Sequence, residues 1–384
     1  MRLTVTLNSV QKVLSCACLT LLLFTWMAAQ ASAQEKPRLK DFGRSLKKDS
    51  RKNKEESQDS KKDKGESDDV IRVQTDLVVC DVLVVNDQGH AIPGLERGDF
   101  VVSEDGNRQE VGTFSLGDDA KVPRSIVLII DYSHSEAPYI KTSVEAAKVL
   151  VDKLGPQDRM ALVTDDVKLL VDFTQDKALL KKSLDSLRKK AASGSFGDSH
   201  QYSALMATLN EMFSQEDPRP IVIFQTDGDQ LTPFKVGATL RTGFSFQDVR
   251  TTVEKSRATI YTIIPGRSLL DLTPDEKVER VLALLPAGLG RQAMISFAER
   301  WSKQQLAIAD LAKLSGGWHD FLEKPEQADE VYARILADIN HRYVIGYYPT
   351  NKTRDGKQRA IKIEVRGHPE YIVWGRKTYF APVE

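Results

Sequence analysis

The chain has 384 residues, and its 54 lysine and arginine side chains balance its 54 aspartate and glutamate side chains, so its formal net charge is zero. A chain without net basic charge has no long-range field that would attract nucleic acid or acidic lipid, and we expect neither as a partner. Of its three cysteines only Cys80 lies beyond residue 33. An internal disulfide is therefore excluded from that point on, and the folded part must depend on an apolar core.

The first 33 residues carry the features of a secretory signal peptide. Basic residues precede an apolar run over residues 13–29, and small residues at 31–33 provide a cleavage site. We therefore expect the mature protein to begin at Gln34 and to be secreted or periplasmic. An uncleaved segment would instead hold the protein at the membrane, because the apolar run approaches the length of a membrane span.

Residues 34–69 are expected to form a disordered, charged tether. They are rich in Lys, Asp, Glu, Ser and Gln, and large apolar side chains are almost absent after Leu46. Burial therefore cannot offset the entropy lost on ordering them. Residues 40–54 are locally basic, which leaves open a role in binding an anionic polymer such as a cell wall.

Two stretches with β-strand patterns flank the centre of the chain. Residues 71–115 contain apolar, β-branched runs separated by turn sequences at 86–89 and 105–107. Residues 342–384 contain further runs, one of which alternates apolar and charged side chains. Neither stretch has enough strands to enclose a core. We therefore predict that they pair in one small antiparallel, β-sandwich-like domain, interrupted by the segment between them.

The interrupting segment, residues 122–341, alternates strand and helix patterns, which predicts a parallel sheet between layers of helices. Strands are expected at 126–130, 159–164, 167–173, 220–226, 259–264 and 318–321, and helices at 143–154, 177–190, 202–213, 247–257 and 327–340. Residues 267–305 are longer than an ordinary connection. They predict a helical insertion, with helices at 275–284 and within 293–314.

Oxygen-bearing side chains gather where the predicted strand 126–130 ends. Asp131, Ser133 and Ser135 follow this strand at a spacing of two, and Asp227 follows the strand at 220–226. Because ligands of such sheets bind beyond the carboxyl ends of the strands, these side chains predict one site. Carboxylate and hydroxyl oxygens are donors that suit a hard cation.

The pattern Asp131-Tyr-Ser133-His-Ser135 resembles the D-x-S-x-S motif of von Willebrand factor A-like domains, and Thr226-Asp227-Gly228 is similar to their later acidic motif. The flanks at 94–106 and 343–357 resemble the VWFA-related family of secreted bacterial proteins. This resemblance covers nearly all of the chain from residue 71. It implies a doubly wound, mostly parallel, Rossmann-like α/β domain with a metal ion-dependent adhesion site, to which Ser199 contributes where the family usually has threonine.

The resemblance implies a non-catalytic protein-binding or adhesion module. Its metal ligands would be Asp131, Ser133, Ser135, Ser199 and Asp227, and its ion Mg²⁺, or Mn²⁺ or Ca²⁺ in its place. Because only the aspartates among these donors are charged, the ion would accept a further oxygen from Asp or Glu of a protein partner. The alternative is a metal-free interaction scaffold of the same fold, since Asp and Ser after a strand often cap the following helix.

A serine esterase is the competing enzyme hypothesis. Residues 197–199 and 338–341 resemble the G-D-S and D-x-x-H blocks of such enzymes, with Ser199 as nucleophile and Asp338 and His341 as its partners. Ser199 follows a polar loop rather than a buried strand, and the other two residues fall at the end of a predicted helix. We therefore expect a protein that is not an enzyme.

Overall fold

The computed structural model describes residues 39, 41–46, 76–119, 122–214, 217, 219–228, 244–266, 268–282 and 290–383. The predicted signal peptide and most of the predicted tether lie outside these residues. By its contacts the chain divides into residues 1–40 and 41–384, and the fold below belongs to the second unit. Within the described ranges, no helix combines the length and hydropathy needed to cross a membrane.

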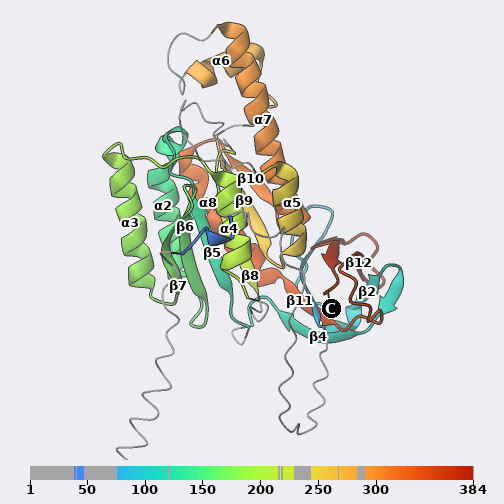
Figure 1. Ribbon diagram of the computed structural model, residues 1–384. Helices are drawn as coiled ribbons and strands as arrows, with labels where there is room; N and C mark the ends of the chain where they lie inside the picture. Colours follow the sequence, from blue (N-terminus) through green and yellow to red (C-terminus); the bar gives the residue numbers. More distant parts are fainter. Residues whose placement is uncertain are drawn as a thin grey trace, which may run out of the picture. The chain divides into compact units, whose positions relative to one another are not determined.

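A six-stranded sheet forms the centre of the fold (Figure 1). Its strands lie in the order β10 (His319–Leu322), β9 (Thr259–Pro265), β8 (Pro220–Gln225), β5 (Ser125–Ile130), β6 (Arg159–Thr164) and β7 (Lys168–Thr174). Neighbouring strands pair in parallel except β6 and β7, which are antiparallel. The predicted doubly wound, mostly parallel sheet is confirmed.

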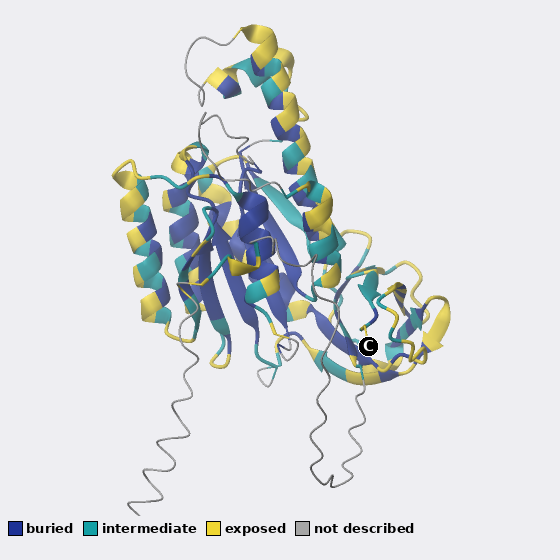
Figure 2. Cartoon of the chain, viewed as in Figure 1, coloured by how far each residue is buried: buried dark blue, intermediate teal, exposed yellow. Residues whose placement is uncertain are grey.

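Helices cover both faces of this sheet, because its central strands are apolar on both sides (Figure 2). The even-numbered residues 126–130 of β5 join one core cluster, and the odd-numbered residues 127 and 129 join another. The first cluster includes side chains of α2 (Ala137–Asp152), α3 (Lys177–Ala192) and α8 (Ala328–His341), and the second includes side chains of α4 (Gln201–Glu211), α5 (Phe246–Lys255) and α7 (Arg291–Leu314). Helix α2 begins before the predicted residue 143, with a proline in its first turn.

The predicted insertion at 267–305 contains α6 (Pro274–Leu282) and the first part of α7. The two helices pack through a small cluster of Val281, Met294 and Ala298. Figure 1 shows α6 beyond the edge of the sheet, with α7 running from it back along the sheet. The insertion therefore stands at one edge of the α/β part and is continuous with a helix that covers it.

Two four-stranded antiparallel sheets form the β part. One has the order β13 (Ile372–Trp374), β1 (Val78–Val85), β11 (Tyr343–Tyr347) and β4 (Val111–Leu116), and the other β14 (Thr378–Phe380), β12 (Gln358–Val365), β2 (Phe100–Glu104) and β3 (Asn107–Gln109). Pairing of β1 with β11 and of β2 with β12 joins strands from before and after the α/β part in each sheet. Their apolar side chains share one core cluster. Short 3₁₀ turns, η3 (Arg97–Asp99) and η5 (Pro325–Gln327), precede β2 and α8.

Buried arginines connect the β part to the α/β part. Arg219, directly before β8, has a fully buried side chain whose Nε lies 2.9 Å from a carboxylate oxygen of Asp81 on β1. Its other nitrogens donate to the backbone oxygens of Gly117 at 2.7 Å and Ile339 at 2.9 Å. Arg342, at the end of α8, donates to the backbone oxygen of Asp81 at 3.1 Å. Asp81 is therefore held by two buried guanidinium groups.

One stretch of the predicted tether is ordered. Residues 41–46 end in the 3₁₀ turn η2 (Arg44–Leu46). The backbone N–H groups of Gly43 and Ser45 donate to the carboxylate of Glu211 on α4, at 2.9 and 2.8 Å. Phe42 and Leu46 pack against the core cluster on the α4 side of the sheet. Tertiary contacts thus order a segment whose composition predicts disorder.

Candidate metal centre

Asp131 and Asp227 lie together at the carboxyl edge of the central sheet. Strands β5 and β8 are parallel neighbours with Ile130 opposite Gln225, so the residues that follow them leave the sheet side by side. The N–H of Asp131 donates to the backbone oxygen of Gln225 at 3.0 Å. Both aspartates are buried, at 0% and 1% exposure. The register of two strands therefore places two acids at one point.

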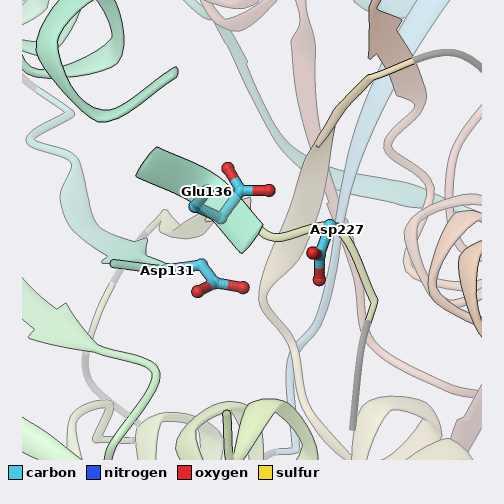
Figure 3. A group of neighbouring side chains, drawn as sticks. All are labelled: Asp131, Glu136 and Asp227. Atoms are coloured by element: carbon cyan, nitrogen blue, oxygen red, sulfur yellow. The ribbon is translucent and has the colours of Figure 1, made fainter. Parts of the chain in front are cut away.

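A third carboxylate, from Glu136, joins these two. Carboxylate oxygens of Asp131, Glu136 and Asp227 lie within 4.8 Å of one another, and Figure 3 shows the three side chains gathered at the strand ends. Glu136 closes the 3₁₀ turn η4 (His134–Glu136), in which its N–H donates to the backbone oxygen of Ser133 at 3.1 Å. Sequence reasoning missed Glu136, because the predicted helix begins only at residue 143, which leaves Glu136 in the connection after the strand.

Hydrogen bonds fix the carboxylate of Asp131. One of its oxygens accepts from the backbone N–H of Ser133 at 2.9 Å, and the other from Nε2 of Gln201 at 2.5 Å and the hydroxyl of Thr226 at 3.1 Å. Burial raises the pKa of Asp131 even though these hydrogen bonds act to lower it. The group is therefore positioned before any ligand arrives.

The two serines of the first motif lie beside each other. The hydroxyl oxygens of Ser133 and Ser135 are 3.1 Å apart, with Ser133 buried and Ser135 half-buried. His134, between them, is exposed and packs edge-on against Phe196, with 5.1 Å between ring centroids. The spacing of two therefore places both hydroxyls on the same side of the turn and directs His134 elsewhere.

Ser199 is buried in the loop before α4. On one side of it, the N–H of Gly197 donates to the backbone oxygen of Tyr132 at 3.2 Å. On the other side, the N–H of His200 donates to the backbone oxygen of Asp165 at 3.2 Å. The loop is thus tied to the segments that follow β5 and β6. Among the described residues, however, the Ser199 hydroxyl makes no hydrogen bond to the three carboxylates.

Asp165 is a fourth buried acid at this edge, at 0% exposure. It follows β6, the other neighbour of β5, and one of its oxygens accepts from the N–H of Tyr132 at 3.1 Å. Its other oxygen has no hydrogen-bond partner in the part of the chain that the structure describes. Burial and then the charge of Asp131 raise the pKa of Asp165 well above its usual range. Asp165 directly follows a predicted strand, as Asp131 does. The sequence pattern that placed Asp131 at this edge could therefore have identified Asp165 as well.

The electrostatics of this edge fit a hard divalent cation. Burial, followed by the charges of Asp227 and Asp131, raises the pKa of Glu136 well above its usual range. One Glu136 oxygen, Oε2, is buried without a hydrogen-bond partner among the described residues. A bound cation would remove the repulsion and satisfy such oxygens, and carboxylates with hydroxyls are the donors that Mg²⁺, Mn²⁺ and Ca²⁺ accept.

The insertion holds the loop that carries Asp227. The indole Nε1 of Trp301, on α7, donates to the backbone oxygen of Asp227 at 2.9 Å. Gly228 has a φ of +79°, and a Cβ atom there would lie 3.2 Å from the backbone nitrogen of Gln305. Glycine at this position therefore allows both the turn and the close approach of α7. The insertion, whose purpose the sequence does not reveal, shapes the site.

The esterase residues do not assemble. Asp338 accepts from the indole of Trp318 at 2.7 Å and from Arg342 at 3.1 Å. His341, three residues later, is exposed at the end of α8. This end of α8 lies by the amino end of β5, because Asn340 accepts from Arg124 at 2.5 Å. The loop of Ser199 lies beyond the carboxyl end, about 20 Å away at roughly 3.3 Å per strand residue. A Ser199–Asp338–His341 triad is therefore not formed.

Comparison with known proteins gives one family match. Residues 126–230 match the family model described as the von Willebrand factor type A domain. These residues run from the first strand of the central sheet past β8, and so include both acidic motifs of the candidate site. No curated protein matches the chain.

Several solved structures are distantly similar. Proximal thread matrix protein 1 from the mussel byssus has 13% identity and a TM-score of 0.39, over 66% of this chain and 50% of that protein. BatB from Bacteroides thetaiotaomicron has 15% identity and a TM-score of 0.35, over 57% of this chain and 98% of its own. Manganese-loaded TRAP protein from Plasmodium vivax has 13% identity and a TM-score of 0.34, over 74% of this chain and 100% of its own.

The match thus spans about half of the mussel protein. TM-scores this low carry no argument of their own, so the assignment rests on the family match and on the observed sheet order. The six-stranded sheet and its helices contain the matched residues and both acidic motifs. The chain therefore carries a von Willebrand factor type A domain.

Proposed function

We propose that this protein is a non-catalytic binding module that recognises a protein partner through a divalent metal ion. The observation that carries the proposal is the group of three buried carboxylate side chains, Asp131, Glu136 and Asp227, whose oxygens lie within 4.8 Å of one another. Domains of this type generally act as protein-interaction modules rather than as enzymes. The proposed ion is Mg²⁺, with Mn²⁺ or Ca²⁺ as substitutes.

The proposed ligands include the five residues expected from the sequence: Asp131, Ser133, Ser135, Ser199 and Asp227. When bound, the ion supplies a Lewis-acidic position that accepts an anionic oxygen. The chain's own part is to hold Asp131 rigidly through Gln201 and Thr226 and to exclude water around the acids. The partner would present Asp or Glu, and residues around the site would select which protein is bound.

Calorimetry of the purified protein with Mg²⁺ and Mn²⁺ tests this proposal. Asp131→Ala should abolish binding, and Ser199→Ala should weaken it. Asp152→Ala is a matched control, because Asp152 lies on α2 with a side chain 58% exposed. Its loss should leave the metal affinity unchanged. Absence of binding by either ion would refute the metal mechanism and leave the metal-free scaffold as the function of this fold.

We also propose that the protein is exported, on the sequence features of residues 1–33. Mass spectrometry of the native protein should find Gln34 as the first residue. Detection of peptides from the intact apolar run would instead indicate a membrane-anchored form.

A further inference from the structure

From its position we infer that Glu136 is a metal ligand supplied by the chain itself, and that a partner's carboxylate reaches the ion only by exchanging with it. This inference rests on the proposed metal-dependent function and concerns the regulation of the same site. The D-x-S-x-S pattern leaves a coordination position for a partner's acid. The structure places an internal acid in the same group of oxygens.

Glu136 has no ordinary structural role that would explain its burial. It is the N-cap residue of α2, yet its side chain makes no capping hydrogen bond. The side chain is nearly completely buried, at 1% exposure, and its Oε2 atom has no hydrogen-bond partner among the described residues. A buried carboxylate in this state is costly unless a cation compensates it.

The protein's own cations do not fill this role within the described part of the chain. Arg280, on α6, attracts Glu136 electrostatically. No ion pair joins the two side chains, however, and the Arg280 guanidinium lies instead beside Gly266 and 5.8 Å from the ring of Trp301. Glu136 therefore turns towards Asp131 and Asp227 rather than towards the arginine.

Asp165 provides an independent indication of a cation at this edge. It lies outside the group of three acids, it is 0% exposed, and one of its oxygens also lacks a partner among the described residues. Glu136 and Asp165 thus each keep a buried carboxylate oxygen without a partner among the described residues, and each lies close enough to Asp131 to feel its charge. A single cation beside Asp131 would compensate both, directly or through a bound water.

An internal third carboxylate changes what the site binds. Two aspartates neutralise a divalent ion, whereas Asp131, Glu136 and Asp227 together leave a net charge of about −1 on the centre. Such a centre holds its metal more tightly and repels an added anion. A partner's acid would therefore compete with Glu136 for the ion. Only a partner whose affinity is high enough to displace Glu136 would bind.

Metal titration with three variants tests this inference. Glu136→Gln removes the charge and keeps the shape, and Glu136→Ala removes the oxygens as well. Glu145→Gln, on α2 with a side chain 46% exposed, is the matched control. We expect Glu136→Gln to lower the Mn²⁺ affinity by about tenfold or more, since affinity follows the number of charged ligands. The control should bind as the unchanged protein does.

Luminescence lifetimes of bound Tb³⁺ in H₂O and D₂O report how many waters the ion keeps. Glu136→Ala should raise this number by about one, because water takes the vacated position. Added acetate should then lower it again and restore part of the lost affinity, since acetate reproduces the missing carboxylate. Affinity lost without rescue by acetate would overturn the exchange step.

The two proposals fail in different ways. If Asp131→Ala abolishes metal binding while both Glu136 variants keep the original affinity and hydration number, Glu136 is not a ligand and the proposed function survives. If Asp131→Ala also binds normally, the metal mechanism itself is wrong. Thermal unfolding of each variant without metal identifies loss of fold. Glu136→Gln should be no less stable than the unchanged protein, because it keeps the shape of the side chain and removes an acid whose charged form burial disfavours.

Discussion

Replacement of Asp81 by alanine should weaken the connection between the β part and the von Willebrand factor type A domain. Asp81 lies on β1, with a carboxylate oxygen 2.9 Å from Nε of Arg219 and another 3.9 Å from Nε of Arg342. The arginine side chains are 0% and 1% exposed. The substitution leaves both positive charges in the protein interior and removes an acid that lies near each of them.

The loss in free energy of unfolding depends on which other interactions the two arginines retain in the variant. Breaking a buried ion pair by removing one partner costs about 3–5 kcal/mol. Arg219 retains two backbone acceptors, and Arg342 retains Asp338 at 3.1 Å. We therefore expect a destabilisation at the lower end of this range, about 3 kcal/mol. That is a large share of a free energy of unfolding of about 5–15 kcal/mol.

Urea unfolding followed by circular dichroism measures this loss. Glu364→Ala is the control, because its ion pair with Lys362 is exposed, and removing it should change the free energy of unfolding by close to zero. The double variant Asp81→Leu with Arg219→Met should be more stable than Asp81→Ala, since it leaves one fewer unpaired charge. Equal costs for Asp81→Ala and Glu364→Ala would refute the reasoning.

Two further predictions concern contacts within the α/β part, at opposite ends of its central sheet. Burial alone would raise the pKa of Asp158, but hydrogen bonds and charge from Arg124 outweigh it and leave this pKa below its usual range. Asp158 therefore stabilises the fold fully above its unfolded pKa of about 4 and loses that contribution as the pH falls through the lower folded value. The destabilisation caused by Asp158→Asn should be constant at neutral pH and shrink in acid, as urea midpoints across pH would report. Trp301→Phe keeps the ring but removes the 2.9 Å hydrogen bond to Asp227, so it should cost about 1 kcal/mol. It should also weaken Mn²⁺ binding in calorimetry, and an unchanged affinity would mean that α7 does not position this loop.

The acids at the carboxyl edge of the sheet were predictable where they directly follow an apolar strand. Asp131 follows an apolar strand, and a parallel sheet brings such positions to one edge, so strand pattern alone indicated that it would meet Asp227. Glu136 was not predictable in this way. Its position depends on the 3₁₀ turn η4, in which the N–H of Glu136 donates to the backbone oxygen of Ser133. Sequence periodicity contains no signal for such a turn.

Other differences arise from tertiary contacts between distant segments. Composition predicts disorder for residues 34–69, yet residues 41–46 are ordered by Glu211, which lies far away in the sequence. The helical insertion was predictable from its length, but its contact with Gly228 was not, because nothing local to residues 267–305 indicates where they fold back. Local patterns therefore identify elements, whereas the partners of a loop emerge only from the fold.

Buried carboxylates at the two ends of β5 differ in whether their oxygens have hydrogen-bond partners. This difference supports a ligand at the carboxyl end. At the amino end, the carboxylate of Asp158 is buried and accepts hydrogen bonds from Arg124. At the carboxyl end, Glu136 and Asp165 are as deeply buried, yet each keeps an oxygen without a hydrogen-bond partner among the described residues. The same strand and the same depth of burial thus accommodate a paired acid in one place and unsatisfied acids in the other. The fold thus supplies a paired arginine for Asp158, whereas among the described residues no ion pair reaches Glu136 or Asp165, and this difference supports the proposed cation site.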